Sequence, residues 1–521
     1  MRDGQALRSV VILGGGTAGW SAAALLAKRL EGSGTTITLV ESSSIPTVGV
    51  GEATIPPIFE FLRFCGIDEV EFIRRTGATM KLGIRFCDWV ELGHAYWHPF
   101  GTFGLTVNER PFHHLWWRNV ADGGTEELAD VCPAIALAEA GKFAFPPPDG
   151  AFPGGGLAYA LHFDAGLVAA YLREVAERGG VVRLDRRVMG GERDGARHGG
   201  EGIAALVLEG GERLEADLFI DCSGFRGMLI EETLAAGYHD WRHWLPCDRA
   251  VAAPSRHRVG RPPYTTATAC TAGWQWRIPL QHRVGNGYVY ASEHLSDEDA
   301  AAALLARIEG PAEADPRFLR FVAGHRRRAW VGNCVAIGLS AGFLEPLEST
   351  SIHLIHTGLY RLLDYWPDRT MAPPLARAYN REVDVEYAHI RDFLLLHYVP
   401  NRRFGEPFWD RMRTLILPDS LAEKIDLFTA SGRIVSRRRE LFADISWWFV
   451  AVGMGLRPDA HDPFVDIPDN AEVRALMRQL GAAMRTYANA APTHDALLDR
   501  LLNPAETRRP NFVQRQAMGA R

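Results

Sequence analysis

The stretch Val10-Val11-Ile12-Leu13-Gly14-Gly15-Gly16-Thr17-Ala18-Gly19 decides the fold. Its four apolar residues predict a buried parallel strand, and the alanine-rich sequence that follows the glycines predicts a helix. Each glycine of the G-x-G-x-x-G pattern has a separate role. Gly14 permits a tight turn, Gly16 lets a pyrophosphate approach the backbone, and Gly19 allows the helix to pack closely on the strand. Because a helix N-terminus also attracts phosphates, the stretch predicts a dinucleotide-binding unit.

A carboxylate stands at the spacing that such a unit requires. Glu41 ends a second predicted strand, residues 36–40, and lies 22 residues beyond Gly19. In this fold an acidic side chain at that place hydrogen-bonds the ribose of the nucleotide.

Strands much later in the chain favour FAD over NAD as the nucleotide. A predicted hairpin, residues 203–218, leads into Asp221-Cys222-Ser223-Gly224, and Val335-Ala336-Ile337-Gly338 predicts another buried strand. Late strands that return to an amino-terminal nucleotide fold are usual in FAD oxidoreductases. No second G-x-G-x-x-G follows a predicted strand, so we expect reduced flavin to come from a separate protein.

The composition narrows the class of protein. Of 521 residues, 47% are hydrophobic and 23% charged, which is typical of a soluble protein with a large core and two to four modules. The net charge of −6 gives no reason to expect nucleic acid as a partner. Seven scattered cysteines without a C-x-x-C pair indicate neither a disulfide framework nor a metal site. We expect no membrane span and a cytoplasmic location.

Arginine supplies nearly all the basic side chains. Of 57 basic residues only Lys28, Lys81, Lys142 and Lys424 are lysines. An arginine never deprotonates, so the remaining lysines are candidates for amine chemistry.

Three further segments resemble the flavin-dependent tryptophan halogenase family. Val48–Thr54 is similar to its flavin strap loop, Gly273–Pro279 contains its W-x-W-x-I-P signature, and Phe343–Thr350 is similar to its catalytic-glutamate segment. With the glycine turn and Lys81, the resemblance covers residues 10 to about 455. It implies an α/β fold in which a Rossmann-like FAD-binding module of the flavin monooxygenase type is interleaved with a mostly helical substrate module.

The resemblance also implies a set of cofactor contacts and partners. The cofactor would be FAD, delivered as FADH2 by a separate flavin reductase, with chloride or bromide as the halide. The implied FAD-contacting residues are Gly14, Gly16, Thr17, Ala18, Gly19, Glu41, Val50, Ala53, Val188, Asp221, Leu339 and Ile352.

Lys81 and Glu348 are the implied catalytic residues. In the family this lysine receives hypohalous acid, as a haloamine or a hydrogen-bonding partner, and burial favours the neutral amine that a haloamine needs. The alternative is a lysine whose stem crosses apolar surface while its ammonium reaches water. Glu348 would polarise the halogenating species or accept the proton of the arene; alternatively it is an acid that only stabilises a helix N-terminus.

A halide site is expected beside this glutamate. The N–H groups of Thr350 and Ser351 at a helix start suit a halide ion. Characterised family members usually carry glycine where Ser351 stands, a change that backbone donors survive.

Each of the candidate aromatic residues allows two interpretations, one structural and one functional. Trp274 and Trp276 alternate along a strand and so share a face, as core residues would; the resemblance implies a wall that separates flavin from substrate. His98, Phe100 and Trp447 are either packed aromatics or substrate contacts. No residues that would grip a free amino acid are evident.

The sequence therefore predicts an FADH2-dependent halogenase acting on an indole or other electron-rich arene through hypohalous acid and a lysine. We expect an FAD module over 1–370, with substrate-module insertions around 80–135 and 230–300, and a helical substrate-covering module over 371–521. The rivals are an FAD-dependent aromatic hydroxylase or reductase and a non-catalytic FAD-binding scaffold protein. The arene, its carbon, free or carrier-bound substrate, halide preference and a homodimer stay open.

Overall fold

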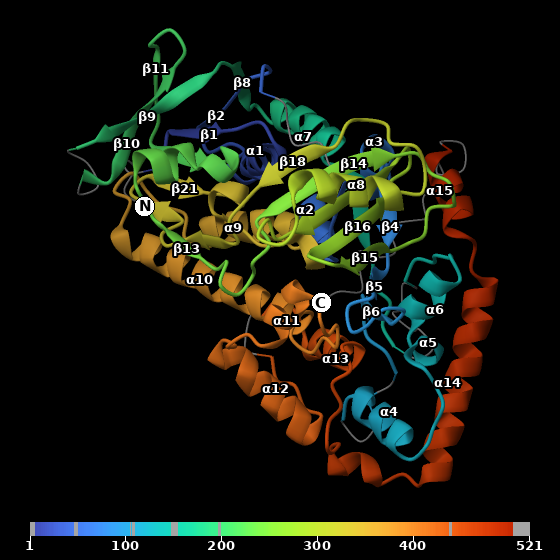
Figure 1. Cartoon of the computed structure of the whole chain (residues 1–521). Helices are drawn as coiled ribbons and strands as arrows, with labels where there is room; N and C mark the ends of the chain where they lie inside the picture. The colour runs from blue at the N-terminus through green and yellow to red at the C-terminus, as the bar shows by residue number, and fades with distance from the viewer. Residues whose placement is uncertain are drawn as a thin grey trace. The chain divides into compact units, whose positions relative to one another are not determined.

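The computed structural model describes residues 6–45, 51–104, 106, 110–146, 155–195, 200–436 and 440–503, and the chain forms two compact units (Figure 1). Unit 1 comprises Met1–Gly77, Phe163–Asp248 and Leu319–Ala388. Unit 2 comprises Ala78–His162, Arg249–Phe318 and His389–Arg521. Within the described residues, no helix is long and apolar enough to cross a membrane.

The core of unit 1 is a six-stranded sheet in the order β20-β21-β12-β1-β2-β8. All neighbours are parallel except β20 and β21. The late strands therefore join the amino-terminal nucleotide fold, as predicted from the sequence. The strands are β1 (Ser9–Leu13), β2 (Thr36–Glu41), β8 (Val182–Asp185), β12 (Leu218–Asp221), β20 (Trp330–Val331) and β21 (Cys334–Ala336).

Helices and two small sheets complete unit 1. The predicted hairpin is confirmed, since β10 pairs antiparallel with β11. Within the segment that resembles the flavin strap, residues 51–53 form the short strand β3 (Gly51–Ala53). The small sheets contain β9 (Val188–Asp194), β10 (Gly202–Leu208) and β11 (Arg213–Glu215), and β13 (Tyr238–Asp240), β19 (Gly324–Arg326) and β22 (Gly342–Phe343).

The helix predicted after the glycine turn is confirmed: it is α1, which follows β1 across that turn and packs on α7 (Figure 1). The segment that carries Glu348 leads into a second long helix, α9. The helices are α1 (Thr17–Arg29), α2 (Ile58–Phe64), α3 (Glu69–Arg75), α7 (Ala165–Arg178), η2 (Gly224–Arg226), η3 (Met228–Thr233), η4 (Gly338–Ser340), η5 (Pro346–Glu348) and α9 (Ser351–Asp364). Helix α10 (Pro373–Leu396) carries the chain from unit 1 into unit 2.

Unit 2 is built on a seven-stranded sheet in the order β18-β14-β17-β16-β15-β5-β6. Its core includes the apolar face of α8, which packs on β14 and β17. Two more strands, β4 (Thr79–Lys81) and β7 (Ala160–Asp164), pair antiparallel. The strands of the large sheet are β5 (Gly83–Cys87), β6 (Ala95–Pro99), β14 (Arg249–Ser255), β15 (Thr265–Cys270), β16 (Gly273–Pro279), β17 (Val284–Tyr290) and β18 (Arg317–Arg320).

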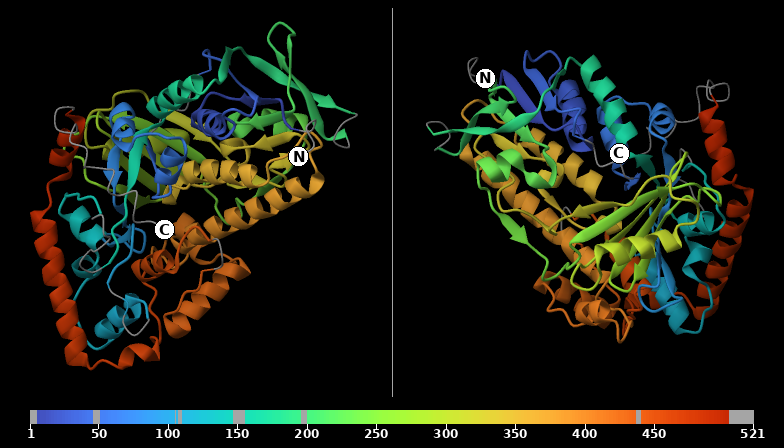
Figure 2. Two further views of the ribbon diagram at one scale, coloured as in Figure 1. Left: turned by 180° about the vertical axis from the view of Figure 1, so that it is seen from behind. Right: turned by 45° about the horizontal axis from the view of Figure 1, so that its top comes forward.

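The remaining helices of unit 2 come mainly from the last third of the chain. Helix α14 packs along α4, α5 and α6 (Figure 2). The helices are α4 (Phe112–Ala121), α5 (Leu128–Val131), α6 (Pro133–Glu139), α8 (Asp297–Arg307), α11 (Pro407–Arg413), α12 (Asp419–Ser431), α13 (Asp444–Gly453), η6 (Pro463–Asp466), α14 (Asn470–Ala490) and α15 (His494–Leu502).

Candidate functional site

The glycines of the turn in unit 1 have two different roles: two of them allow close packing, and one leaves open space. Gly14 has φ +114°, and a Cβ there would lie 2.4 Å from the carbonyl oxygen of Cys222. A Cβ on Gly19 would lie 1.8 Å from the carbonyl oxygen of Gly14. By contrast, a Cβ on Gly16 would meet nothing within 4 Å. Gly14 and Gly19 thus hold helix to strand, and Gly16 opens the start of α1, as a pyrophosphate requires.

Glu41 lies over this turn. Its Oε2 would stand 1.4 Å from a Cβ on Gly15, so the carboxylate occupies the space that the glycine leaves. Its Oε1 accepts a hydrogen bond from Nε of Arg183 at 2.5 Å. No sequence pattern pointed to Arg183, which reaches Glu41 because β2 and β8 are neighbours. The pair keeps a carboxylate at the place where a ribose hydroxyl would bind.

Asp221 is fully buried and holds the turn after β12. Its carboxylate accepts hydrogen bonds from the backbone N–H groups of Ser223, Leu229 and Ile230 at 2.8–2.9 Å. This arrangement fixes the chain beside Gly14, so Asp221 supports the nucleotide turn through the backbone.

The other implied cofactor residues are spread over unit 1. A Cβ on Gly338 would lie 2.8 Å from Cβ of Ala18, so η4, which contains Leu339, packs tightly on the start of α1 near Thr17. Ile352 is buried in the first turn of α9, which also packs on α1. Val188 begins β9 and Ala53 ends β3. Val50 lies outside the described residues.

Glu52, beside Ala53 on β3, is a feature that the sequence did not single out. Burial raises the pKa of its carboxyl to about 7. A carboxyl with such a pKa changes protonation near neutral pH, within the segment that resembles the flavin strap.

The segment that carries Glu348 has an unusual backbone. Glu348 is fully buried at the end of η5, and Ser349 adopts a left-handed conformation with φ +59°. Such a conformation is costly for a residue with a side chain and is concentrated at functional sites. Thr350 is buried at the N-cap of α9, where its hydroxyl caps no N–H and has no hydrogen-bond partner among the described residues. Ser351 begins the helix, so polar donors surround this N-terminus.

Lys81 is the only fully buried residue among the four lysines, all of which the structure describes. Its Nζ lies 5.0 Å from the centre of the Phe100 ring. Its burial on β4 differs from the surface arrangement in which a lysine ammonium reaches water. The other three lysines are more exposed: Lys28 pairs with Glu31, Lys142 donates to the Asn489 carbonyl and Lys424 pairs with Glu440.

The lysine strand is tied to the end of the tryptophan strand. Thr79 Oγ1 donates to the Pro279 carbonyl at 2.6 Å, and Gln281 Nε2 donates to the Ala78 carbonyl at 2.6 Å. His162 bridges Thr79 and Thr265 through its two ring nitrogens, each at 2.9 Å. Burial, reinforced by the nearby Lys81 charge, holds the pKa of His162 well below its usual range, so this imidazole is neutral. These bonds fix the position of Lys81 relative to β16.

The two tryptophans of β16 share a face, as the alternation predicted. Their ring centres lie 6.1 Å apart, and Trp276 packs over Gly287 of the neighbouring strand. Trp274 continues into a buried cluster through Trp89, at 6.3 Å. Within unit 2 both tryptophans pack as core side chains. Separation of flavin from substrate stays a prediction.

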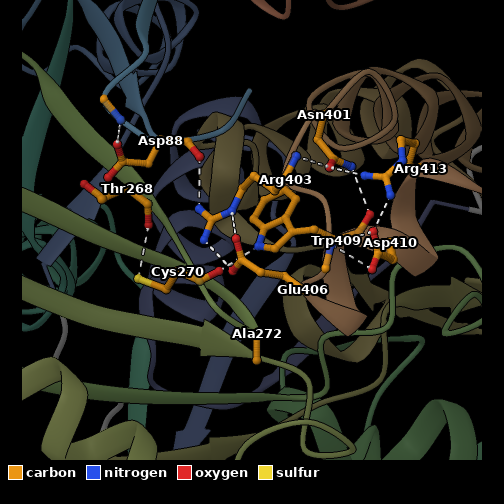
Figure 3. Close-up of polar contacts among 12 residues, drawn as sticks. Asp88, Thr268, Cys270, Ala272, Asn401, Arg403, Glu406, Trp409, Asp410 and Arg413 are labelled. Atoms are coloured by element: carbon orange, nitrogen blue, oxygen red, sulfur yellow. Dashed lines mark hydrogen bonds and ion pairs between the residues drawn. The ribbon is translucent and has the colours of Figure 1, made fainter. Parts of the chain in front are cut away.

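A polar network fixes the turn that leads into β16 (Figure 3). Trp409 Nε1 donates to the Cys270 carbonyl at 2.7 Å, just before Gly273. Arg403 lies over the Trp409 ring, pairs with Glu406 at 2.6 Å and donates to the Asp88 carbonyl at 3.0 Å (Figure 3). The indole of Trp409 therefore anchors the end of β15, just before the tryptophan strand begins, and the ion pair of Arg403 with Glu406 lies against that indole.

The structure brings His98 and Trp447 into one aromatic cluster. Phe393 links them: its ring is 5.4 Å from His98 and 4.9 Å from Trp447. Phe442 stacks on Phe393 at 3.8 Å, and Phe100 lies 6.4 Å from His98. Phe393 and Phe442 escaped notice in the sequence because neither belongs to a motif.

Polar atoms border this cluster. Trp447 is buried, and its Nε1 has no hydrogen-bond partner among the described residues. Lys424 Nζ lies 4.3 Å from the Trp447 ring centre and 2.8 Å from a buried carboxylate oxygen of Glu440.

Comparison with known proteins places these features in context. Residues 9–470 match the family described as tryptophan halogenase. Tryptophan 7-halogenase RebH of Lentzea aerocolonigenes is 36% identical over 493 residues, which are 87% of this chain and 91% of that protein. Tryptophan 6-halogenase ThaL of Streptomyces albogriseolus is 34% identical over 491 residues, 87% and 90% of the two chains.

Among solved structures, BrvH, a flavin-dependent halogenase from Brevundimonas sp. BAL3, is 45% identical with a TM-score of 0.90. The superposition covers 95% of this chain and 99% of BrvH. Sequence and fold therefore agree over nearly the whole chain.

Proposed function

Because the chain belongs to the flavin-dependent tryptophan halogenase family, we propose that it uses FADH2, O2 and chloride or bromide to halogenate an indole or another electron-rich arene. The observation that carries this proposal is Lys81. It is a fully buried lysine above an aromatic ring, in a chain whose basic residues are nearly all arginines. A hydroxylase or a scaffold protein needs no such amine.

The cofactor site is the glycine turn. Gly16 leaves room for the pyrophosphate, and Glu41 presents a carboxylate to the ribose. Reduced flavin, when bound here, would give two electrons to O2 and the halide would give the other two, so that one oxygen atom leaves as water and the other ends in hypohalous acid. A separate flavin reductase is the expected source of FADH2.

Lys81 and Glu348 handle the halogen and the proton. After losing a proton, Lys81 takes the halogen of hypohalous acid on Nζ and releases water; alternatively, its ammonium holds the acid by a hydrogen bond. The arene attacks that halogen, and its ring proton passes to a base; Glu348 fills this role. Thr350 and Ser351 hold the halide at the start of α9.

The substrate lies against the aromatic cluster of His98, Phe100 and Trp447. RebH and ThaL are named for different carbons of tryptophan, and the name of the more similar BrvH gives no substrate. These names leave both the arene and its carbon open.

The test is a halogenation assay with FAD, a flavin reductase, NADH, O2 and bromide against a panel that includes indole and tryptophan. Mass spectrometry should show the bromine isotope pattern in at least one product. Flavin reoxidation with oxygenated products and no halide dependence would instead establish a hydroxylase.

A further inference from the structure

A cavity of about 670 Å³ lies in unit 2, a volume within the range of small-molecule sites. Thr266, Thr268, Gln275, Arg277 and Asn286 form one side of it. Successive strands present these side chains in register, since Arg277 pairs with both Thr266 and Asn286. Gln275 and Arg277 alternate with Trp274 along β16, so this is the sheet face opposite Trp274. Trp276 also borders the cavity.

Two buried donors in this wall have no acceptor in the part of the chain that the structure describes. Gln275 is 8% exposed, and its Nε2 has no hydrogen-bond partner among the described residues. The same holds for Nε of Arg277 within that part of the chain, although its Nη2 pairs with Glu309 at 2.9 Å. Buried N–H groups are almost always satisfied, so two of them on one cavity wall indicate a ligand with acceptor oxygens.

The charge around the cavity also favours a ligand with acceptor oxygens. Four arginines border it, at positions 85, 261, 277 and 307, against two carboxylates, Glu309 and Asp495. Arg261 pairs with Asp495 at 2.6 Å, and Arg277 pairs with Glu309. Arg85 lies over the Trp97 ring, and Arg307 donates to Cys270 Sγ at 3.1 Å. In the described part of the chain neither has a carboxylate partner, so two guanidinium groups remain for an anion.

We propose that this cavity is a second ligand site, which binds a small organic anion through carboxylate or phosphate oxygens. Gln275 and Arg277 donate to the oxygens from the sheet, and Arg85 and Arg307 neutralise the charge from the rim. Guanidinium groups suit both kinds of oxyanion because their donors are planar and forked. The site is independent of the halogenation chemistry and requires none of Lys81, Glu348 or bound flavin.

Binding of two probes to the full-length protein tests the proposal: succinate for the dicarboxylate arm and inorganic phosphate for the phosphate arm. Isothermal titration calorimetry, at constant ionic strength and chloride, should show saturable binding of at least one probe, with a matching rise in Tm. Arg307→Gln should weaken that binding about tenfold, and the nearly isosteric Gln275→Glu should weaken it at least as much.

The control is Arg29→Gln, which removes an arginine from the last turn of α1 just as Arg307→Gln removes one from the last turn of α8. It should leave the Kd unchanged. Two results would overturn the proposal: no saturable binding of either probe up to about 10 mM, or equal Kd values in the Arg307 and Arg29 variants. Because the readout is binding, a failed halogenation assay has no bearing on it.

Discussion

The glycine turn of unit 1 prepares its site with backbone, whereas the surroundings of Lys81 in unit 2 are prepared with side chains. In the turn, three glycines within six residues set the geometry, and the side chains of Glu41, Arg183 and Asp221 support it from elsewhere in the chain. Near Lys81, side-chain hydrogen bonds join residues that span 200 positions of the chain: Thr79, His162, Thr265 and Pro279. Substitution of the packing glycines Gly14 and Gly19 should therefore lower stability, whereas substitution of Lys81 should remove chemistry and leave the fold intact.

The largest expected effect is on the lysine. Lys81→Ala should lower halogenation more than about a thousandfold, because no other buried amine replaces it, while FAD binding stays within about twofold. Lys142→Ala, at a lysine that only donates to a backbone carbonyl, is the matched control and should keep full activity. Product formation and flavin titration check both. Halogenation by Lys81→Ala within tenfold of the unsubstituted enzyme would remove the lysine from the mechanism.

Lys81→Arg distinguishes the two proposed roles of the lysine, which are the haloamine and the hydrogen-bonding partner of hypohalous acid. Arginine keeps the positive charge and cannot form a haloamine under these conditions. A dead enzyme favours the haloamine, and partial activity favours a hydrogen-bonding cation.

The glycine turn offers the contrasting experiment. Gly14→Ala should cost about 3 kcal/mol of unfolding free energy, because the new Cβ meets a carbonyl at 2.4 Å in a left-handed conformation. Gly16→Ala should leave Tm unchanged and weaken FAD binding about tenfold, since its Cβ enters space meant for the pyrophosphate. Chemical denaturation and flavin titration separate the two effects. Equal stability losses at both positions would contradict the division of roles.

Glu52 gives a pH-dependent effect of intermediate size. Its folded pKa of about 7 lies above the usual 4.5, so the ionised form is penalised in the folded state. The penalty is full above pH 7 and disappears as pH falls from 7 toward 4.5. Glu52→Gln should therefore stabilise the FAD-free protein by about 1–3 kcal/mol at pH 8 and by almost nothing at pH 4.5. Urea titrations at the two pH values measure the difference; a pH-independent change would place the cause elsewhere.

The smallest effect is expected at Thr79. Thr79→Val removes the hydroxyl that joins His162 to the Pro279 carbonyl, at a cost of about 1–2 kcal/mol. Because the lysine strand loses its tie to β16, kcat should also fall severalfold. Thr76→Val, which removes a buried hydroxyl bonded to the Phe72 carbonyl in unit 1, should lose similar stability and keep kcat. A parallel loss of kcat in both variants would reduce Thr79 to a general stabiliser.

The sequence was most informative where function depends on local spacing. The order of β1, α1 and β2 follows from the apolar run and the glycines, and the return of β12 and β21 follows from apolar runs that end in Asp221 and Gly338. Arg183, Phe393 and Phe442 were missed for a physical reason. Each of them contacts a residue that is distant in the sequence. A single arginine or phenylalanine belongs to no motif whose spacing would predict that contact.

The polar network of Figure 3 illustrates the same limit. Its arginine, carboxylate and indole, Arg403, Glu406 and Trp409, form a compact group in sequence. Their target, the Cys270 carbonyl, lies 139 positions earlier and has no side-chain signature. Hydrogen bonds to the backbone are common in folded proteins and leave no trace in composition.

Each compact unit is assembled from three separated stretches of chain, which has consequences for synthesis and for inheritance. On the ribosome, unit 1 waits for residues up to 388 and unit 2 for the last helices, so long-range closure comes late and folding should be slow. Neither unit can be excised or exchanged as one continuous piece of a gene. New substrate preferences in such a chain should therefore arise by point substitution and loop insertion, with module shuffling excluded by the path of the backbone.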